Sequence, residues 1–340
     1  MDQQLFQNET KSVFRRAWHL VGPASELAKP GAYLTTDVGR ESLVLVNDSR
    51  TLRGFFNVCR HRAGPLASGC GQTRRLVCRY HGWTYDLSGK LLRAPEMEGV
   101  ADFDTHSIHL REVLVHRFGP LLFVALDDQT LPFDAYCPGV SSEMAQLKMA
   151  QMQHVMRCDY PVNANWKNYI DNFLEGYHIP LIHPALDREL DYDSYSTKLG
   201  VRSVLQFAPI RAAGAQFYRD GSADNQARYF WLYPNIMLNF YENQLQTNKV
   251  IPLDVDHSIV RFDWFALPPP PNPESDQRFR SLLAFSEQIQ AEDAAICESV
   301  QRNFSSIAFL PGRYSRQREA GVHLFHRLVL SSGDIGSLTD

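Results

Sequence analysis

The chain has 340 residues, more than the ~100–200 of a typical single domain, so we expect two domains. Its formal net charge is only −4, with acidic and basic residues mixed, which argues against a nucleic-acid partner and against a polybasic membrane anchor. The sequence shows no secretory leader pattern and no apolar run of ~18 residues, so we expect a cytoplasmic protein with no membrane partner.

The first third of the chain is predicted to be a small all-β domain. Short runs rich in β-branched and aromatic residues, at 42–46, 52–58 and 121–126, are separated by turn residues. A polar segment at 127–132 ends in proline, so the predicted domains are residues 1–130 and 131–340.

Two short motifs in this region each pair a cysteine with a histidine. Cys59 and His61 form a CxH motif, and Cys78 and His81 form a CxxH motif. This is the ligand set of a Rieske [2Fe-2S] cluster, in which two thiolates hold one iron and two imidazoles hold the other. A structural zinc site usually groups cysteine with cysteine and histidine with histidine, and four unconnected residues would reproduce the spacing only by coincidence. The first domain is therefore expected to carry single electrons.

The second half is predicted to be an α+β domain. Helical periodicity comes first, β-like runs follow at 228–232 and 259–265, and a long closing helix is predicted over 277–304. A proline-rich stretch at 268–273 is expected to be an extended connection on the surface.

Two histidines follow a predicted amphipathic helix near residue 165. Four aromatic residues repeat there at steps of three and four, which predicts one buried face, and they are Trp166, Tyr169, Phe173 and Tyr177. His178 and His183 lie on either side of Pro180, where the helix is expected to end. A distorted turn could bring both rings to one metal ion, although a histidine beside an apolar face is more often a hydrogen-bonded core residue.

An apolar stripe along the closing helix is interrupted once by a carboxylate, Asp293. The stripe consists of Phe285, Ile289, Ile296, Val300 and Phe304. A buried carboxylate must find a proton, a cation or a metal, whereas the neighbouring Glu292 is expected on the solvated flank. Asp293 could form a buried ion pair with an arginine. With His178 and His183 it would instead complete a two-histidine, one-carboxylate triad, which leaves positions open on Fe(II) for oxygen chemistry.

Over nearly its whole length the sequence resembles the catalytic α subunit of Rieske non-haem iron oxygenases. The resemblance rests on the CxH and CxxH motifs, on the NWK…DNFxExYHxxxxH segment that ends at His183, and on the late acidic helix around Asp293. Several further stretches are most similar to the choline monooxygenase branch of that family, at residues 191–195, 233–235, 297–301, 312–314 and 321–326.

The resemblance implies a fold, two cofactors and their ligands. The fold would be a small all-β Rieske domain followed by a larger α+β catalytic domain, with an antiparallel sheet and a long closing helix in a helix-grip-like arrangement. Cys59 and Cys78 would hold the inner iron of the [2Fe-2S] cluster, and His61 and His81 the outer one. The mononuclear Fe(II) would be held by His178, His183 and Asp293.

Glu175 occupies the position of a carboxylate that carries electrons in this family. The resemblance implies that electrons pass from the cluster of one subunit to the mononuclear iron of its neighbour through this residue, three positions before the first iron-binding histidine. Most members have aspartate there, and the longer glutamate is similar to carnitine- and betaine-type members. A solvated glutamate on the helix surface is the alternative.

The implied activity is mono- or dioxygenation of a small organic substrate with O2 and electrons from an NAD(P)H-dependent reductase or ferredoxin, in a homotrimer. Six aromatic residues could form a cage for a quaternary ammonium compound or pack a core, namely Tyr229, Phe230, Trp231, Tyr233, Phe240 and Tyr241. Ring hydroxylation or O-demethylation of a small aromatic acid is the alternative. A Rieske electron carrier without oxygenase activity would leave Asp293 unexplained.

Overall fold

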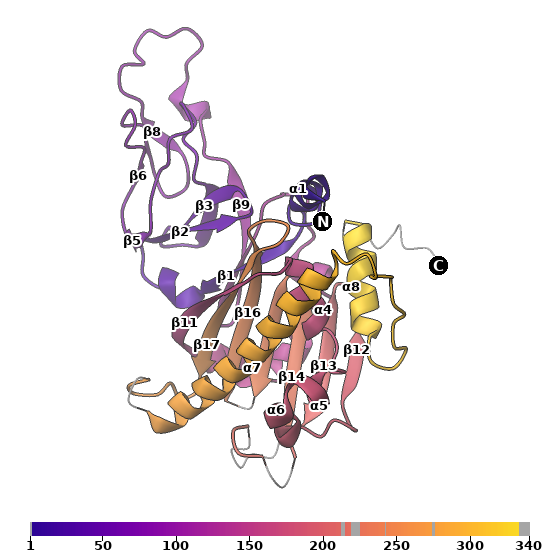
Figure 1. Ribbon diagram of the computed structural model, residues 1–340. Helices are drawn as coiled ribbons and strands as arrows, with labels where there is room; N and C mark the ends of the chain where they lie inside the picture. Colours follow the sequence, from indigo (N-terminus) through magenta and orange to yellow (C-terminus); the bar gives the residue numbers. More distant parts are fainter. Residues whose placement is uncertain (1, 212–214, 219–224, 242, 274–275, 333–340) are drawn as a thin grey trace. The chain divides into compact units, whose positions relative to one another are not determined.

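The computed structural model describes residues 2–211, 215–218, 225–241, 243–273 and 276–332 (Figure 1). Contacts divide the chain into a unit of residues 14–130 and a unit that joins residues 1–13 to the chain from Leu131 onward. Among the described residues, none of the helices has the length and apolar character needed to cross a lipid bilayer.

The unit of residues 14–130 is built from antiparallel sheets. A seven-stranded sheet has the order β1-β10-β9-β4-β3-β2-β5, and a three-stranded sheet has the order β6-β7-β8. The strands are β1 (Trp18–Pro23), β2 (Ala32–Val38), β3 (Glu41–Asn47), β4 (Leu52–Phe56), β5 (Cys70–Gln72), β6 (Leu76–Val77), β7 (Thr84–Tyr85), β8 (Leu91–Arg93), β9 (Glu112–Phe118) and β10 (Leu121–Ala125). Two 3-10 helices connect them, η1 (Ala24–Leu27) and η2 (Thr105–Ser107).

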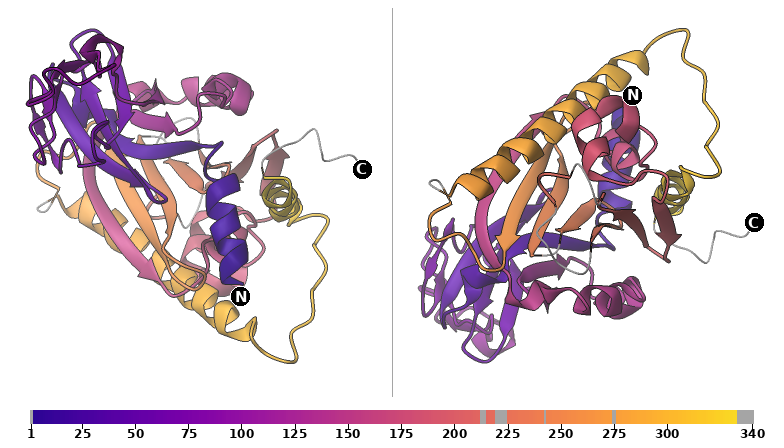
Figure 2. Two further views of the ribbon diagram at one scale, coloured as in Figure 1. Left: turned by 90° about the horizontal axis from the view of Figure 1, so that it is seen from above. Right: turned by 90° about the horizontal axis from the view of Figure 1, so that it is seen from below.

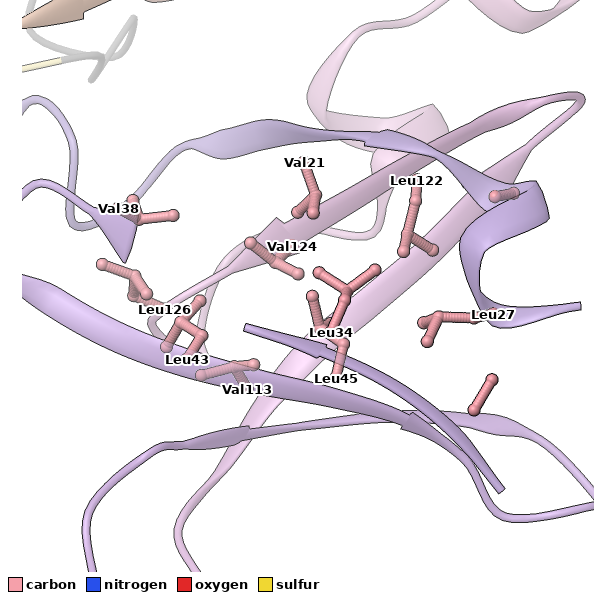
Figure 3. Close-up of a cluster of buried hydrophobic side chains, with 12 residues drawn as sticks. Val21, Leu27, Leu34, Val38, Leu43, Leu45, Val113, Leu122, Val124 and Leu126 are labelled. Carbon is pink, nitrogen blue, oxygen red and sulfur yellow. The ribbon is translucent and has the colours of Figure 1, made fainter. Parts of the chain in front are cut away.

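Strand β3 is buried on both faces, which explains its continuous apolar run. Leu43 and Leu45 pack into a core with residues of β2 and β10 (Figure 3). Val44 and Val46 face the other way, into a second core that also contains Cys59 and Cys78. Successive side chains of a strand point to opposite faces, so one strand supports both cores. The two cysteines are therefore held by packed side chains.

The other unit is a seven-stranded antiparallel sheet flanked by helices. Its order is β11-β17-β16-β15-β14-β13-β12. The strands are β11 (Gln153–Val162), β12 (Ser196–Leu199), β13 (Ser203–Pro209), β14 (Gln226–Leu232), β15 (Ile236–Tyr241), β16 (Gln244–Pro252) and β17 (Ser258–Ala266). The helices are α1 (Gln3–Ser12), α2 (Phe133–Tyr136), α3 (Val140–Ala145), η3 (Lys148–Gln151), α4 (Trp166–Phe173), α5 (Ile179–Ile182), α6 (Pro184–Glu189), α7 (Gln277–Asn303) and α8 (Ala320–Leu330).

The long helix α7 is observed almost as predicted. The carboxylate of Asp276 caps its first turn by accepting a hydrogen bond from the backbone N–H of Phe279 at 2.8 Å. The helix crosses the sheet obliquely and packs against α4 and β11 (Figures 1 and 2). It does not end the domain, because α8 follows and contacts α4 and β12.

The N-terminal helix α1 belongs with the sheet of residues 153–266, whereas the sequence had placed it in the first domain. Glu9 of α1 is 7% exposed, and both of its carboxylate oxygens accept hydrogen bonds from Lys167 Nζ, at 2.7 and 2.6 Å. A buried carboxylate needs such a partner, so this pair attaches α1 to α4.

Helix α4 is shorter than the aromatic repeat suggested. Trp166 and Tyr169 are buried as predicted, but the helix ends at Phe173, and Tyr177 is 58% exposed. Because the backbone leaves the helical path after Phe173, Tyr177 no longer lies on the same face.

Asp263 of β17 is a buried carboxylate away from the histidine cluster. It accepts hydrogen bonds from His154 Nε2 at 2.8 Å and from Arg157 Nε and Nη2 at 2.9 and 3.0 Å. Burial alone would raise its pKa, but the hydrogen bonds from His154 and Arg157 hold the pKa of Asp263 below its ordinary value of 3.8.

Candidate metal centres and substrate cavity

The CxH and CxxH motifs form two similar turns. In each turn a backbone N–H donates to the carbonyl of the cysteine four residues earlier, Ala63 to Cys59 at 3.1 Å and Gly82 to Cys78 at 2.9 Å. Both donor residues have left-handed backbone angles, with φ of 58° and 75°. Glycine adopts this conformation without strain, whereas Ala63 needs the surrounding turn to hold it.

The four predicted cluster ligands converge, with thiols inside and imidazoles outside. Cys59 and Cys78 are 3% and 2% exposed. Burial raises the pKa of Cys59, and the neighbouring thiol of Cys78 adds to the rise. The exposed rings of His61 and His81 lie with their centroids 4.6 Å apart. This arrangement fits a Rieske cluster, with one iron on buried thiolates and the other on exposed imidazoles.

Three neighbours support these turns, and two of them, Tyr85 and Trp83, were not singled out for this role from the sequence. The hydroxyl of Tyr85 lies 3.3 Å from Cys59 Sγ and accepts a hydrogen bond from the backbone N–H of Arg60 at 3.1 Å. The indole of Trp83 stacks on His61 with the ring centroids 4.8 Å apart. A side chain at Gly64 would place its Cβ 2.8 Å from Cys78 Sγ, so only glycine fits there.

His178, His183 and Asp293 meet at one point although they come from three elements. His178 precedes α5, His183 lies between α5 and α6, and Asp293 lies on α7. Asp293 Oδ1 is 3.0 Å from His183 Nε2 and 3.7 Å from His178 Nε2, and the three candidate ligand atoms lie within 4.8 Å of one another. Two imidazole nitrogens and one carboxylate suit a mononuclear non-haem Fe(II). Asp293 faces these rings, and among the described residues its ion pairs are with the two histidines and not with an arginine.

Two glutamates bind the Nδ1 atoms of the His178 and His183 rings, on the side away from Asp293. His178 Nδ1 donates to Glu175 and His183 Nδ1 donates to Glu292, each at 2.6 Å. Fixing Nδ1–H in this way leaves Nε2 of both rings free for a metal. Burial lowers the pKa of His183, but its hydrogen bonds to Asp293 and Glu292 outweigh that effect and raise the pKa above its ordinary value.

Glu292 lies on the flank of α7 as predicted, with its side chain 26% exposed against 15% for Asp293, but its contact with His183 was not predicted. It lies at the edge of α7 next to Asp293, and its reach to His183 depends on where α5 and α6 are packed. No local sequence pattern signals that contact.

A cavity of about 90 Å³ lies beside the three candidate ligands. Its aromatic lining includes Phe173, Tyr195, Tyr218, Tyr229 and Tyr241. Of the six aromatic residues proposed from sequence, Tyr229 and Tyr241 line it. The other four, Phe230, Trp231, Tyr233 and Phe240, are buried but do not line it.

The tyrosines pack as a group. The rings of Tyr218 and Tyr241 stack with centroids 3.9 Å apart, and Tyr229 meets Tyr241 edge-on at 6.0 Å. Burial raises the pKa of all three phenols well above the ordinary value, so they stay neutral at physiological pH. The cavity therefore has aromatic faces without phenolate charge.

Comparison with known proteins agrees with both halves of this architecture. Residues 17–104 match the family model of the Rieske [2Fe-2S] domain, and residues 149–332 match that of the ring hydroxylating alpha subunit (catalytic domain). The chain belongs to the Rieske non-haem iron oxygenases, as a catalytic α subunit that uses a [2Fe-2S] cluster and a mononuclear iron.

Within that family the chain is similar to enzymes named for choline and carnitine. It is 32% identical to the chloroplastic choline monooxygenase of Arabidopsis thaliana over 96% of this chain and 80% of that protein. It is 29% identical to the carnitine monooxygenase oxygenase subunit of Escherichia coli K12 over 96% and 90%.

Solved structures give the same result. A quaternary ammonium Rieske monooxygenase aligns with a TM-score of 0.87 and 26% identity, over 98% of this chain and 93% of that one. Naphthalene 1,2-dioxygenase aligns with a TM-score of 0.76 at 19% identity, which shows a shared fold.

Proposed function

We propose that this oxygenase is a monooxygenase that hydroxylates a C–H bond of a small quaternary ammonium compound. One atom of O2 enters the substrate and the other leaves as water, with two electrons and two protons supplied from outside. The observation that carries the proposal is the group of neutral tyrosines beside His178, His183 and Asp293, because aromatic faces attract a quaternary ammonium by cation–π interaction.

The size of the cavity also supports this substrate class. Sites for drug-sized ligands enclose about 300–1,000 Å³, whereas this cavity holds about 90 Å³. A compact aliphatic cation suits it better than a fused aromatic system. The similarity to choline and carnitine monooxygenases points the same way.

Seven residues would hold the two cofactors in this proposal. The cluster would lie on Cys59, Cys78, His61 and His81, and the mononuclear iron on His178, His183 and Asp293. When bound, the iron supplies open coordination positions at which O2 is reduced. The protein's part is to fix both imidazoles through their Nδ1–H bonds, to keep Asp293 oriented by the hydrogen bond from Asn172 Nδ2 at 2.5 Å, and to exclude water from the aromatic cavity.

Glu175 is proposed to carry electrons to the iron site. Its carboxylate accepts from His178 Nδ1 and also from the backbone N–H of His178 at 3.0 Å, so it contacts one candidate iron ligand directly. The electrons would come from the cluster of a neighbouring subunit in a homotrimer, and that cluster would be reduced by an NAD(P)H-dependent reductase or ferredoxin. The expected cytoplasmic location stays a prediction.

Replacing Glu175 by Gln tests this path, because the change removes the charge while keeping the size. We expect both metals to remain bound and single-turnover oxidation of the pre-reduced cluster, in the presence of O2 and substrate, to slow by at least about tenfold, which is about 1.4 kcal/mol of activation free energy. Glu287→Gln, at an exposed position of α7, is the matched control. Unchanged kinetics in the Glu175 variant would remove this residue from the electron path.

The substrate class is tested by O2 consumption with a surrogate reductase. Quaternary ammonium compounds are expected to stimulate O2 uptake and to be converted stoichiometrically, and small aromatic acids are not. Stimulation by aromatic acids alone would replace the proposal by ring hydroxylation or O-demethylation. A chain that exchanges electrons but activates no O2 with any substrate would be an electron carrier.

A further inference from the structure

A row of buried polar side chains crosses the sheet at the cavity. Gln206 on β13 is directly opposite Tyr229 on β14, Tyr229 is opposite Asn239 on β15, and Asn239 is opposite Gln246 on β16. Residues directly opposite each other on antiparallel strands share one face of the sheet, and all four line the cavity. Their sequence neighbours are mostly apolar, so each residue is a polar interruption of a buried strand.

Two members of the row offer hydrogen-bond acceptors without a partner. Gln206 Nε2 donates to the carbonyl of Phe173 at 2.9 Å, and Asn239 Nδ2 donates to Gln246 Oε1 at 3.3 Å. These bonds orient the two amides, and they leave Gln206 Oε1 and Asn239 Oδ1 with no partner among the described residues. The two residues are 1% and 6% exposed. Buried polar atoms are rarely left unpaired in native proteins, so a bound molecule is expected to satisfy them.

One unpartnered donor lies on the helix side of the same cavity. Gln290 Oε1 accepts from the hydroxyl of Tyr169, while Gln290 Nε2 has no partner in the described chain. The hydroxyl of Tyr229 also lines the cavity without a partner among the described residues, so the cavity presents two free acceptors, one free donor and one hydroxyl that can donate or accept. A hydroxyl group can donate one hydrogen bond and accept two, whereas a carboxylate can only accept.

Among the described residues, the lining of the cavity includes no lysine or arginine that could pair with a substrate carboxylate. Glu175 contributes a negative charge there, whereas the charge of Asp293 would be offset by the Fe(II) it is proposed to hold. A substrate carboxylate placed against Gln206 and Asn239 would face two free acceptor oxygens. Of the unpartnered groups that line the cavity among the described residues, only the Tyr229 hydroxyl and Gln290 Nε2 could donate to it, so burying it at the two amides would be costly.

We propose that Gln206 and Asn239 are specificity-determining residues that accept a hydrogen bond from a substrate hydroxyl, and that they select an ammonium alcohol over an ammonium carboxylate. The inference rests on the proposed function and adds which end of the substrate these residues bind. Tyr229 lies between them in the row, one strand spacing of about 4.8 Å from each. A compact molecule can therefore place its ammonium against the tyrosines and its hydroxyl against either amide.

The test compares three quaternary ammonium probes in the full enzyme with a surrogate reductase. The probes are choline, which has a hydroxyl; ethyltrimethylammonium, which lacks it; and glycine betaine, which has a carboxylate instead. For the wild type we expect kcat/KM to be about 10- to 100-fold higher for choline than for glycine betaine, because the site pairs with only one of them. Calorimetric binding of the three probes gives a readout that does not depend on turnover.

The variants remove one acceptor at a time. Because a hydroxyl donates only one hydrogen bond, one of the two variants, Gln206→Met or Asn239→Leu, is expected to lower kcat/KM and affinity for choline by about tenfold. Both are expected to leave ethyltrimethylammonium nearly unchanged. Thr247→Val is the matched control, because Thr247 Oγ1 is also buried and unpartnered among the described residues but does not line the cavity. Should Asn239→Leu not fold, Asn239→Asp keeps an acceptor and is expected to retain the preference for choline.

Three results would overturn the inference, and they differ in whether the proposed function survives. A preference for glycine betaine, or choline selectivity unaffected by either acceptor variant, would refute the role of Gln206 and Asn239 while the quaternary ammonium function stands. Oxidation of none of the three probes would refute both.

Discussion

Glu292 is predicted to set the iron affinity of the mononuclear site without touching the metal. Among the described residues it is the one hydrogen-bond acceptor that His183 Nδ1 reaches, at 2.6 Å, and the His183 side chain is 1% exposed. In Glu292→Ala this buried N–H loses its hydrogen-bond partner, and leaving it unpaired costs about 1–3 kcal/mol of free energy. Loss of such an outer partner typically lowers metal affinity by about 10- to 100-fold, and tenfold corresponds to about 1.4 kcal/mol, so the two figures agree.

The measurement is the dissociation constant of Fe(II) at the mononuclear site, by competition with a ferrous chelator in protein whose cluster is intact. Glu292→Gln keeps an acceptor oxygen and is expected to lose less affinity than Glu292→Ala. Gln288→Ala is the control, since Gln288 is exposed and donates at 2.9 Å to Glu292 Oε1, the oxygen that does not bind His183. Wild-type iron affinity in Glu292→Ala would refute the assignment of this glutamate as the group that positions His183.

Three further predictions concern ligation and stability. Asp293→Ala is expected to lower total iron from about 1.5 to about 1 per acid-labile sulfide, with the cluster's visible spectrum unchanged. Asp263→Asn is expected to destabilise the fold by about 3 kcal/mol near neutral pH in denaturant titrations. Because the folded pKa of Asp263 lies below 3.8, that difference is complete above 3.8 and disappears as the pH falls through the folded pKa; a constant difference would contradict the prediction. Lys167→Met is expected to lower the free energy of unfolding by about 2–3 kcal/mol in denaturant titrations, because it leaves the buried Glu9 carboxylate without a partner. The added change Glu9→Gln is expected to recover part of that loss.

The candidate ligands were predictable because each breaks a local pattern. The cysteine and histidine pairs repeat at short spacing, and Asp293 is a carboxylate within an apolar stripe of α7. Such conflicts between a residue and its surroundings are visible in one stretch of sequence. The long helix and the strands were predictable for the same reason, since periodicity is local.

The predicted boundaries that differ from the structure depend on contacts between residues far apart in the sequence. Helix α1 belongs with α4 because Glu9 meets Lys167, more than 150 positions later in the chain. Tyr177 continues the spacing of the aromatic repeat, but the chain turns away after Phe173 so that His178 can face His183. In both places tertiary contacts override a local tendency.

The row of polar side chains at the cavity could not be predicted from the sequence, because it depends on the register of the strands. Gln206, Asn239 and Gln246 belong to three different strands. Each interrupts a mostly apolar stretch, but no single stretch shows that the three side chains meet at one cavity. Only the register brings them together, and a shift of one residue in any strand would turn its polar side chain to the opposite face. The candidate iron ligands are thus marked by their chemistry, whereas the residues proposed to choose the substrate are marked only by strand pairing. Similarity over the ligand motifs therefore identifies the class of enzyme, and substrate choice has to be argued from the register of the sheet.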